Sequence, residues 1–251
     1  MSKLIDEGAT AKIYRNGDIA TKAYSNATAP EVKNEINRQQ FAYDAGLVVP
    51  NVYEVKRLDD GRIAFDMEYI DGTPLIHHDM NEVEMVGAMN ILVTLQCEMH
   101  QILAAELPKL SDIMIQKIRS TNLESEVKNE LLTLLSQLDD KSEKLCHGDF
   151  HPLNVLYDGK KYWIIDWVDA AAGSPLADVC RTYLLMKPQI EKLAVLYLKV
   201  LCNEKGCQIN DVLKWQPVVA AARLSENIDD LSRDYLHSLV QNWFEGGSYE
   251  N

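Results

Sequence analysis

The most informative segment of the sequence reads His147-Gly148-Asp149-Phe150-His151-Pro152-Leu153-Asn154, and Asp166 follows at the end of the apolar run Trp163-Ile164-Ile165. The segment combines a carboxylate, two imidazoles and an amide. Gly148 and Pro152 predict a loop, because both residue types favour turn conformations. A carboxylate at the end of a buried strand is costly unless a cation or hydrogen-bond donors receive it. Asp166 is therefore a candidate functional residue.

A predicted hairpin separates Asn154 from Asp166. Two apolar runs lie on either side of the turn Asp158-Gly159, which is the pattern of paired strands. Because the two polar residues flank this hairpin, we expect both to point into one pocket. An amide oxygen and a carboxylate are hard ligands of the kind that Mg²⁺ prefers, with waters and phosphates completing its octahedron. The pattern predicts a magnesium site at Asn154 and Asp166, with Asp149 free to accept a hydroxyl proton.

The first 70 residues carry short apolar runs separated by turn signals, which is typical of β-strands. Asn16-Gly17 indicates a hairpin, since both turn positions need a positive φ. Pro30, with Thr28 as a candidate cap, predicts a helix that ends near Gly46. We expect a five-stranded sheet with one helix after the third strand, and the strands are Leu4-Ile5, Lys12 to Arg15, Asp18 to Tyr24, Val52 to Leu58 and Arg62 to Ile70.

After residue 70, helical periodicity dominates the chain. The fold class is predicted as α+β, with a small antiparallel β-sheet lobe and one helix over residues 1–70, and a larger, mostly helical lobe over residues 71–251. Ligands tend to bind in a cleft between two such lobes. The predicted helices of the second lobe span 81–105, 123–138, 176–187, 189–203 and 217–244, and its strands are Leu145-Cys146, Val155 to Tyr157 and Lys161 to Ile165.

Composition and charge argue against several classes of protein. The chain has 251 residues, with 25 Lys and Arg against 38 Asp and Glu, a net charge of −13. This charge argues against a nucleic-acid partner, which needs a basic face. No stretch approaches the ~18 apolar residues of a membrane span, and no secretory signal follows the first residues. Five scattered cysteines predict reduced thiols and a cytoplasmic location.

The pattern His-Gly-Asp-x-His-x-x-Asn, followed by an apolar strand and Ile165-Asp166-Trp167, resembles the aminoglycoside phosphotransferase and choline kinase family. The resemblance runs from residue 8 to residue 178 and implies the protein-kinase-like bilobal fold, with ATP and Mg²⁺ as cofactors. In that pattern an aspartate accepts the proton of the substrate hydroxyl, and an asparagine and a second aspartate hold the metal ions. The resemblance assigns these roles to Asp149, Asn154 and Asp166.

The same resemblance implies a nucleotide site in the first lobe. A kinase has a lysine on its third strand, paired to a glutamate on the following helix. Lys22 and Glu35 match these positions, and Glu31, one turn earlier, is the alternative partner. The loop around Gly8 matches the loop that covers the phosphates, although it has one glycine instead of three.

The segment Met67-Glu68-Tyr69-Ile70-Asp71-Gly72 resembles the hinge that binds adenine. The resemblance implies that Glu68 and Ile70 offer main-chain groups and that Met67 sits behind the base. Asp178 resembles the family's buried acid, which supports the catalytic loop from below.

An alternative chemistry for the same segment is a metal hydrolase. His147, Asp149 and His151 would then be ligands, with His77-His78 adding more. This alternative leaves Lys22, Asn154 and Asp166 without a role. In the kinase interpretation His147 and His151 instead fix the loop.

We therefore predict an ATP- and Mg²⁺-dependent enzyme that transfers the γ-phosphate to a hydroxyl of a small molecule, such as an aminoglycoside or another amine-bearing alcohol. The alternatives are a protein serine/threonine kinase and a catalytically silent nucleotide-binding module. An acidic surface at Glu226, Asp230 and Asp234 on the last helix would receive a cationic acceptor, although a solvated outer helix face is the favoured interpretation of these residues.

Overall fold

The computed structural model describes residues 3–8 and 10–246, and their contacts divide the chain into two compact units. The first unit comprises the chain up to His78 together with Pro152–Asp169, and the second comprises Asp79–His151 and the chain from Ala170 onward. The segment that carries Asn154 and Asp166 therefore belongs to the same unit as the N-terminal sheet. The two lobes with separate roles, 1–70 and 71–251, stay a prediction.

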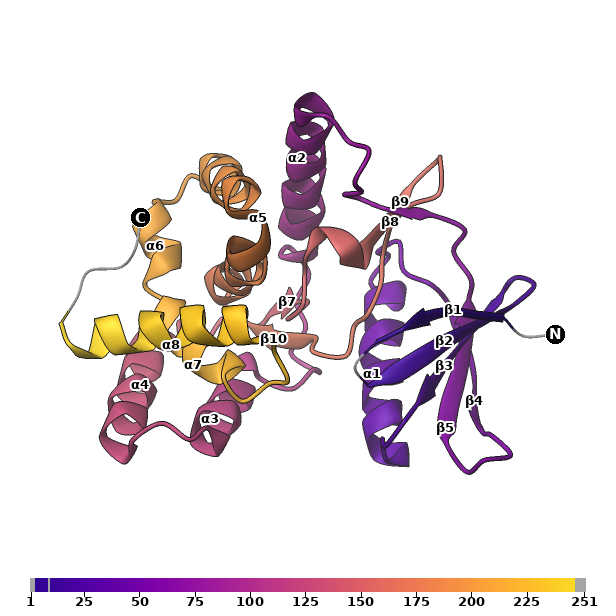
Figure 1. Ribbon diagram of the computed structural model, residues 1–251, viewed down its shortest axis with the longest axis horizontal. Helices are drawn as coiled ribbons and strands as arrows, with labels where there is room; N and C mark the ends of the chain where they lie inside the picture. Colours follow the sequence, from indigo (N-terminus) through magenta and orange to yellow (C-terminus); the bar gives the residue numbers. More distant parts are fainter. Residues whose placement is uncertain (1–2, 9, 247–251) are drawn as a thin grey trace. The chain divides into compact units, whose positions relative to one another are not determined.

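The first unit contains the predicted antiparallel sheet of five strands, in the order β1-β2-β3-β5-β4 (Figure 1). Asn16 and Ile19 pair across the predicted turn, where Gly17 has a φ of 62°. The predicted β-sheet is confirmed, and its strands are β1 Lys3–Glu7, β2 Ala11–Asn16, β3 Ile19–Tyr24, β4 Val52–Arg57 and β5 Ile63–Glu68.

One helix, α1 (Ala29–Asp44), follows β3 and contacts β4 and β5. It begins where predicted, because the Glu31 carboxylate accepts hydrogen bonds from the Thr28 N–H at 2.7 Å and from the Thr28 hydroxyl at 2.8 Å. Its buried Val32 belongs to a core cluster with Tyr24 and Phe65 of the sheet. This packing fixes the face of α1 that carries Glu35.

A second small sheet completes the first unit, in the order β6-β8-β9. Its strands are β6 Thr73–Pro74, β8 Val155–Tyr157 and β9 Tyr162–Ile164, and a short 3₁₀ turn, Pro152–Asn154, precedes β8. Gly72 lies so close to β8 that a Cβ there would stand 3.0 Å from the Tyr157 carbonyl oxygen. Gly159 turns the β8–β9 hairpin with a φ of 89°, as the sequence predicts.

The second unit is mostly helical. Its strands β7 Lys144–Cys146 and β10 Ala171–Gly173 form an antiparallel pair. Its helices are α2 Glu82–Met99, α3 Leu110–Ser120, α4 Ser125–Leu138, α5 Pro175–Lys205, α6 Ile209–Leu213, α7 Gln216–Arg223 and α8 Asp230–Phe244. Helix α5 is kinked at Pro188 and Ile190, where Ile190 has φ −140°, and this kink corresponds to the break that the sequence predicts between two helices.

Two predictions about this unit are wrong, and two of its helices, α3 and α6, were not predicted. Helix α2 ends at Met99 instead of residue 105, and the predicted helix 217–244 is broken between α7 and α8. Asp229 causes the second break, because its carboxylate caps α8 by accepting the Ser232 N–H at 2.9 Å. Helix α3 was not predicted, although its buried Leu110, Met114 and Ile118 recur every four residues. In the described part of the chain, no helix is long and apolar enough to cross a membrane.

Candidate active site

Lys22 is a buried cation in the first unit. It lies on β3, and 9% of the residue is exposed. Its ammonium donates hydrogen bonds to Glu35 Oε1 at 2.6 Å and to Asp166 Oδ1 at 2.9 Å. Glu35 is 2% exposed and also accepts a hydrogen bond from the Tyr24 hydroxyl. The fold thus places one cation between two carboxylates that are far apart in the sequence.

The charge of Lys22 is stabilised by these neighbours. Burial by itself lowers the pKa of Lys22, because it disfavours the charged form, but the carboxylates of Glu35 and Asp166 outweigh burial and raise the pKa above its usual value. Lys22 is therefore an ammonium ion throughout the neutral range. Glu31, the alternative partner, binds Thr28 at the start of α1 instead.

Asp166 and Asn154 lie at the two ends of the β8–β9 hairpin. The Ile165 N–H donates to the Asn154 carbonyl oxygen at 3.0 Å, which joins the two ends. Asp166 has a φ of 65°, a left-handed conformation that is uncommon outside glycine, and its side chain is 38% exposed. An amide oxygen and a carboxylate are hard oxygen ligands, so the donor set of this hairpin fits the predicted Mg²⁺ ion.

Gly8, the predicted phosphate-loop residue, follows β1. Its N–H donates to the Ala11 carbonyl oxygen at 2.9 Å, and the residue is exposed. A Cβ at Gly8 would meet the same oxygen at 3.6 Å, an ordinary contact. The position therefore does not require glycine for space. Ala9, in the middle of the predicted loop, lies outside the described residues.

The three predicted hinge residues lie at the end of the sheet. Met67 and Glu68 are the last residues of β5, and Ile70 is buried in the connection that follows. The Glu68 N–H donates to the Asn51 carbonyl oxygen at 2.8 Å, and the amide of Gln39 lies 3.8 Å from Met67 Sδ. Glu68 thus uses its N–H inside the protein, so its adenine contact would have to use the carbonyl oxygen.

Asp149 belongs to the second unit and lies in the loop after β7. Its Oδ2 is 3.6 Å from His151 Nε2, and its Oδ1 is 3.7 Å from Arg181 Nη2. Burial on its own raises the pKa of Asp149, but His151 and Arg181 outweigh burial and hold the pKa well below its usual range. Asp149 is therefore an ionised carboxylate whose two oxygens face different nitrogen groups, with a quarter of its side chain exposed.

The loop that carries Asp149 is fixed by its own side chains. His147 is fully buried, its Nδ1 accepts the Asp149 N–H at 3.2 Å, and its ring packs against Phe150. The structure thus gives His147 the loop-fixing role that the sequence predicts.

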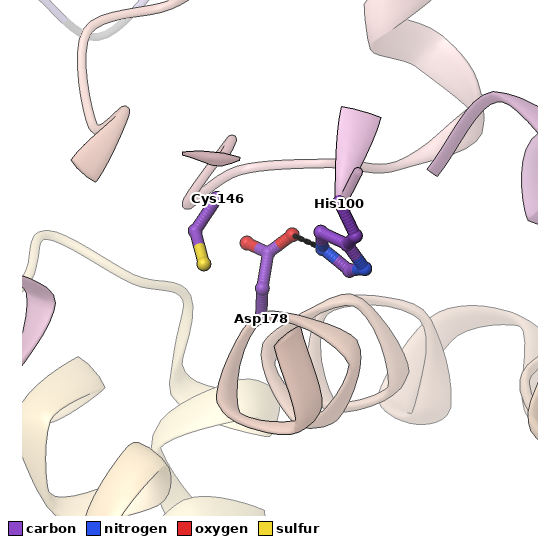
Figure 2. A group of neighbouring side chains, drawn as sticks. All are labelled: His100, Cys146 and Asp178. Carbon is purple, nitrogen blue, oxygen red and sulfur yellow. Dashed lines mark hydrogen bonds and ion pairs between the residues drawn. The ribbon is translucent and has the colours of Figure 1, made fainter. Parts of the chain in front are cut away.

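A buried network around Asp178 supports this loop, as the family resemblance implies, and it includes two partners, Gln96 and His100, that the sequence analysis missed. Asp178, near the start of α5, accepts the Gly148 N–H on Oδ1 at 2.8 Å. Its Oδ2 accepts a hydrogen bond from the Gln96 amide at 2.9 Å and lies 2.9 Å from His100 Nε2. Figure 2 shows His100 from the end of α2 and Cys146 from β7 on either side of the Asp178 carboxylate. The signal that could have revealed it is the position of Gln96 and His100, four residues apart on one helical face.

The group His100, Cys146 and Asp178 has the spacing of metal ligands, and it is the group of that kind found among residues 3–8 and 10–246. Both oxygens of Asp178 are already engaged in hydrogen bonds, and burial raises the pKa of the Cys146 thiol. Burial also lowers the pKa of His100. These groups fit a buried hydrogen-bonded network around the Asp178 carboxylate better than a metal site. The ligand set of the metal hydrolase alternative is not brought together in this way.

Glu226 lies between α7 and α8 and is surrounded by cations. Its Oε1 accepts hydrogen bonds from Lys117 and from Arg181, both at 2.7 Å, and its Oε2 is 3.7 Å from Arg223 Nε. The proposed acidic surface for a cationic acceptor therefore loses Glu226, whose charge is already compensated. Asp230 and Asp234 remain exposed on α8.

Comparisons with known proteins agree with the fold described above. Residues 3–207 match the model of the phosphotransferase enzyme family. No curated protein matches the chain. The choline kinase LicA from Streptococcus pneumoniae is similar in fold, with a TM-score of 0.69 at 12% identity over 96% of this chain and 93% of that one.

Two further solved structures share the fold. A choline/ethanolamine kinase family protein from Mesorhizobium loti has a TM-score of 0.67 at 18% identity and covers 98% of this chain and 88% of its own. The aminoglycoside phosphotransferase APH(3'')-Id from Streptomyces rimosus, in complex with ADP and streptomycin, has a TM-score of 0.67 at 16% identity and covers 90% of this chain and 93% of its own. The fold predicted from the sequence is confirmed.

Proposed function

The chain belongs to the phosphotransferase enzyme family, and we propose that it transfers the γ-phosphate of ATP, in the presence of Mg²⁺, to a hydroxyl group of a small molecule. The observation that carries the proposal is the contact of the Lys22 ammonium with both Glu35 and Asp166. A surface lysine needs no buried partner, whereas a lysine that binds phosphates must be held in place and kept charged.

In the proposed reaction, Lys22 donates hydrogen bonds to the α- and β-phosphates, and Glu35 holds it there. Asn154 and Asp166 would hold Mg²⁺, which neutralises charge on the β- and γ-phosphates when it is bound. The loop at Gly8 covers the phosphates, and Met67, Glu68 and Ile70 contact the adenine.

Asp149 is the proposed catalytic residue. It orients the acceptor hydroxyl by accepting its hydrogen bond and takes the proton as the phosphoryl group is transferred. A strongly basic group is not required, because the transition state of phosphoryl transfer is loose and positioning supplies most of the acceleration. The lowered pKa of Asp149 keeps it in the accepting, ionised form.

A small acceptor is favoured over a protein substrate by the length of one connection. Residues 167–170 alone join Asp166 to β10, which leaves no room for the activation segment of a protein kinase. Streptomycin and hygromycin B, bound by similar structures, support an amine-bearing alcohol. We propose the cytoplasm as the location, in keeping with five free cysteines.

The proposal is tested by a screen for acceptor-dependent release of ADP, with aminoglycosides, choline, ethanolamine and sugars as acceptors and Asp149→Ala as the background control. We expect one class to raise ADP release in the unsubstituted protein alone. A protein that binds ATP and releases no ADP with any acceptor would favour the silent nucleotide-binding module.

A further inference from the structure

Arg181 is a buried cation next to the proposed catalytic residue. It stands on α5, three residues after Asp178, and 9% of its side chain is exposed. Its Nε donates to the Gly148 carbonyl oxygen, and its Nη2 lies 3.7 Å from Asp149 Oδ1. One guanidinium group thus reaches both the backbone that precedes Asp149 and the carboxylate of Asp149.

Two side chains on one face of α5 bind both polar backbone groups of Gly148. Asp178 accepts its N–H at 2.8 Å and Arg181 donates to its carbonyl oxygen. Residues three apart on a helix share a face, so the two side chains act from the same side. Gly148 has a φ of 79°, a conformation available to glycine without strain. The backbone position of Asp149 is therefore set by α5.

Glu226 holds Arg181 in this orientation. Arg181 Nη1 donates to Glu226 Oε1 at 2.7 Å, and Nη2 donates to Oε2 at 3.4 Å. Such a two-pronged contact fixes the plane of the guanidinium. Glu226 also offsets the repulsion between Arg181 and Arg223, a repulsion that acts with burial to lower the pKa of Arg223 to about 10. Lys117 also donates a hydrogen bond to the Glu226 carboxylate.

We propose that Arg181 is a positioning residue for phosphoryl transfer, which holds the carboxylate of Asp149 toward the acceptor hydroxyl, and that Glu226 keeps Arg181 in place. This inference rests on the proposed function. The charged and titratable groups that interact with Asp149 include Arg181 from α5, Arg223 from α7, and His147 and His151 from its own loop. Of the two arginines, Arg181 has a guanidinium nitrogen 3.7 Å from the Asp149 carboxylate.

The first experiment compares Arg181→Gln and Arg181→Lys with Lys199→Gln, an exposed charge removed from the same helix. We expect Arg181→Gln to lower kcat by about 10- to 100-fold, since a small misplacement of a catalytic group has effects of this size. The KM for ATP should stay within about twofold, because the nucleotide contacts lie elsewhere, and Arg181→Lys should recover part of the loss by keeping the charge. An unchanged kcat in Arg181→Gln would overturn the proposal.

Glu226→Gln tests the second half of the inference without removing the arginine. We expect a smaller loss of kcat in the same direction, again with an unchanged KM for ATP. Thermal unfolding of each variant identifies any that does not fold. A Glu226→Gln protein that is folded and fully active shows that Arg181 needs no partner, and this result would overturn the role of Glu226.

A measurement that needs no acceptor separates this inference from the proposed function. Titration of the Asp149 carboxyl carbon by NMR, in protein labelled at aspartate and assigned with Asp149→Ala, reports the pKa of that group. We expect Arg181→Gln to raise the pKa of Asp149 and Lys199→Gln to leave it unchanged. If the pKa of Asp149 is the same in the unsubstituted protein, in Arg181→Gln and in Lys199→Gln, the contact between Arg181 and Asp149 is contradicted. This result does not depend on knowing the phosphate acceptor.

Discussion

The ammonium of Lys22 lies 2.9 Å from the carboxylate of Asp166, 144 residues further along the chain. The same ammonium lies 2.6 Å from Glu35. Burying one of these charges alone would be costly, so the three groups support one another. This arrangement is the structural basis of the proposed nucleotide site, because it keeps Lys22 charged and holds it beside the residue that would bind Mg²⁺.

Replacing Lys22 by methionine should weaken ATP binding and the fold together. We expect the KM for ATP to rise by about 10- to 100-fold, since a hydrogen bond to a charged group contributes about 1.5–3 kcal/mol. The free energy of unfolding should fall by about 3–5 kcal/mol, because Glu35 is left buried without its cation. Steady-state kinetics and urea unfolding measure the two effects.

The control is Lys33→Met, which removes an exposed lysine from α1 and should change neither quantity. Adding Glu35→Gln to Lys22→Met should restore part of the stability and none of the ATP binding. If the double variant is no more stable than Lys22→Met, the uncompensated charge of Glu35 is not the cause of the loss.

Removing the carboxylate of Asp178 should destabilise the second unit. Asp178→Ala leaves the Gly148 N–H and the Gln96 amide without their acceptor, and an unsatisfied buried donor costs about 1–3 kcal/mol. Asp234→Ala, which removes an exposed carboxylate from α8, should stay within about 0.5 kcal/mol of the unsubstituted protein. Urea unfolding at pH 7 compares them, and equal losses in both variants would contradict the buried network.

The pH dependence of stability follows from the same residue. Hydrogen bonds from His100, Gln96 and Gly148 outweigh burial and lower the pKa of Asp178 below its usual 3.8. A lowered pKa means that the stabilisation is present above pH 3.8 and is lost as the pH falls through the folded-state value. The free energy of unfolding should therefore decline as the pH falls below about 3.8, and it should decline less steeply in Asp178→Ala. An identical slope would contradict the assignment.

Replacing a glycine by alanine should lower the stability of the protein at Gly173 and raise it at Gly87. A Cβ at Gly173, on β10, would stand 2.4 Å from the Leu110 Cβ, so Gly173→Ala must displace α3 and should cost about 1–3 kcal/mol. At Gly87, exposed in α2, a Cβ meets nothing within 4 Å, and Gly87→Ala should stabilise the protein by about 0.5–1 kcal/mol. Thermal unfolding distinguishes them, and a stabilised Gly173→Ala protein would contradict the packing of β10 on α3.

Local sequence signals were sufficient to predict the five-stranded sheet and helix α1 of the first unit. Asn16-Gly17 and Asp158-Gly159 mark turns that only a few residue types can form, and Thr28 with Pro30 marks the start of α1. The pairing of Lys22 with Glu35 came from the family resemblance, which left Glu31 as the alternative partner. The family resemblance then related them to Asp166, which no local pattern could have done.

The ends of the helices and the surroundings of Asp149 could not be predicted in the same way. Helical periodicity continues past Met99 and across Asp229, and the chain leaves the helix at these places because of contacts and caps. Arg181 and Glu226 come from different elements of the second unit, so their pairing depends on packing. The sequence signal that could have revealed Arg181 is its position, as a single basic residue three positions after Asp178 in a mostly apolar stretch.

The most direct test of the account compares Asp149→Ala and Asp166→Ala in two assays, Mg²⁺-dependent binding of ATP and acceptor-dependent release of ADP. We expect Asp149→Ala to bind ATP normally and to lose about 10²- to 10⁴-fold of the transfer rate, the usual contribution of a general base. Asp166→Ala should lose both activities. Full transfer by Asp149→Ala, or unchanged Mg²⁺-dependent binding of ATP by Asp166→Ala, would contradict the proposed phosphotransferase reaction.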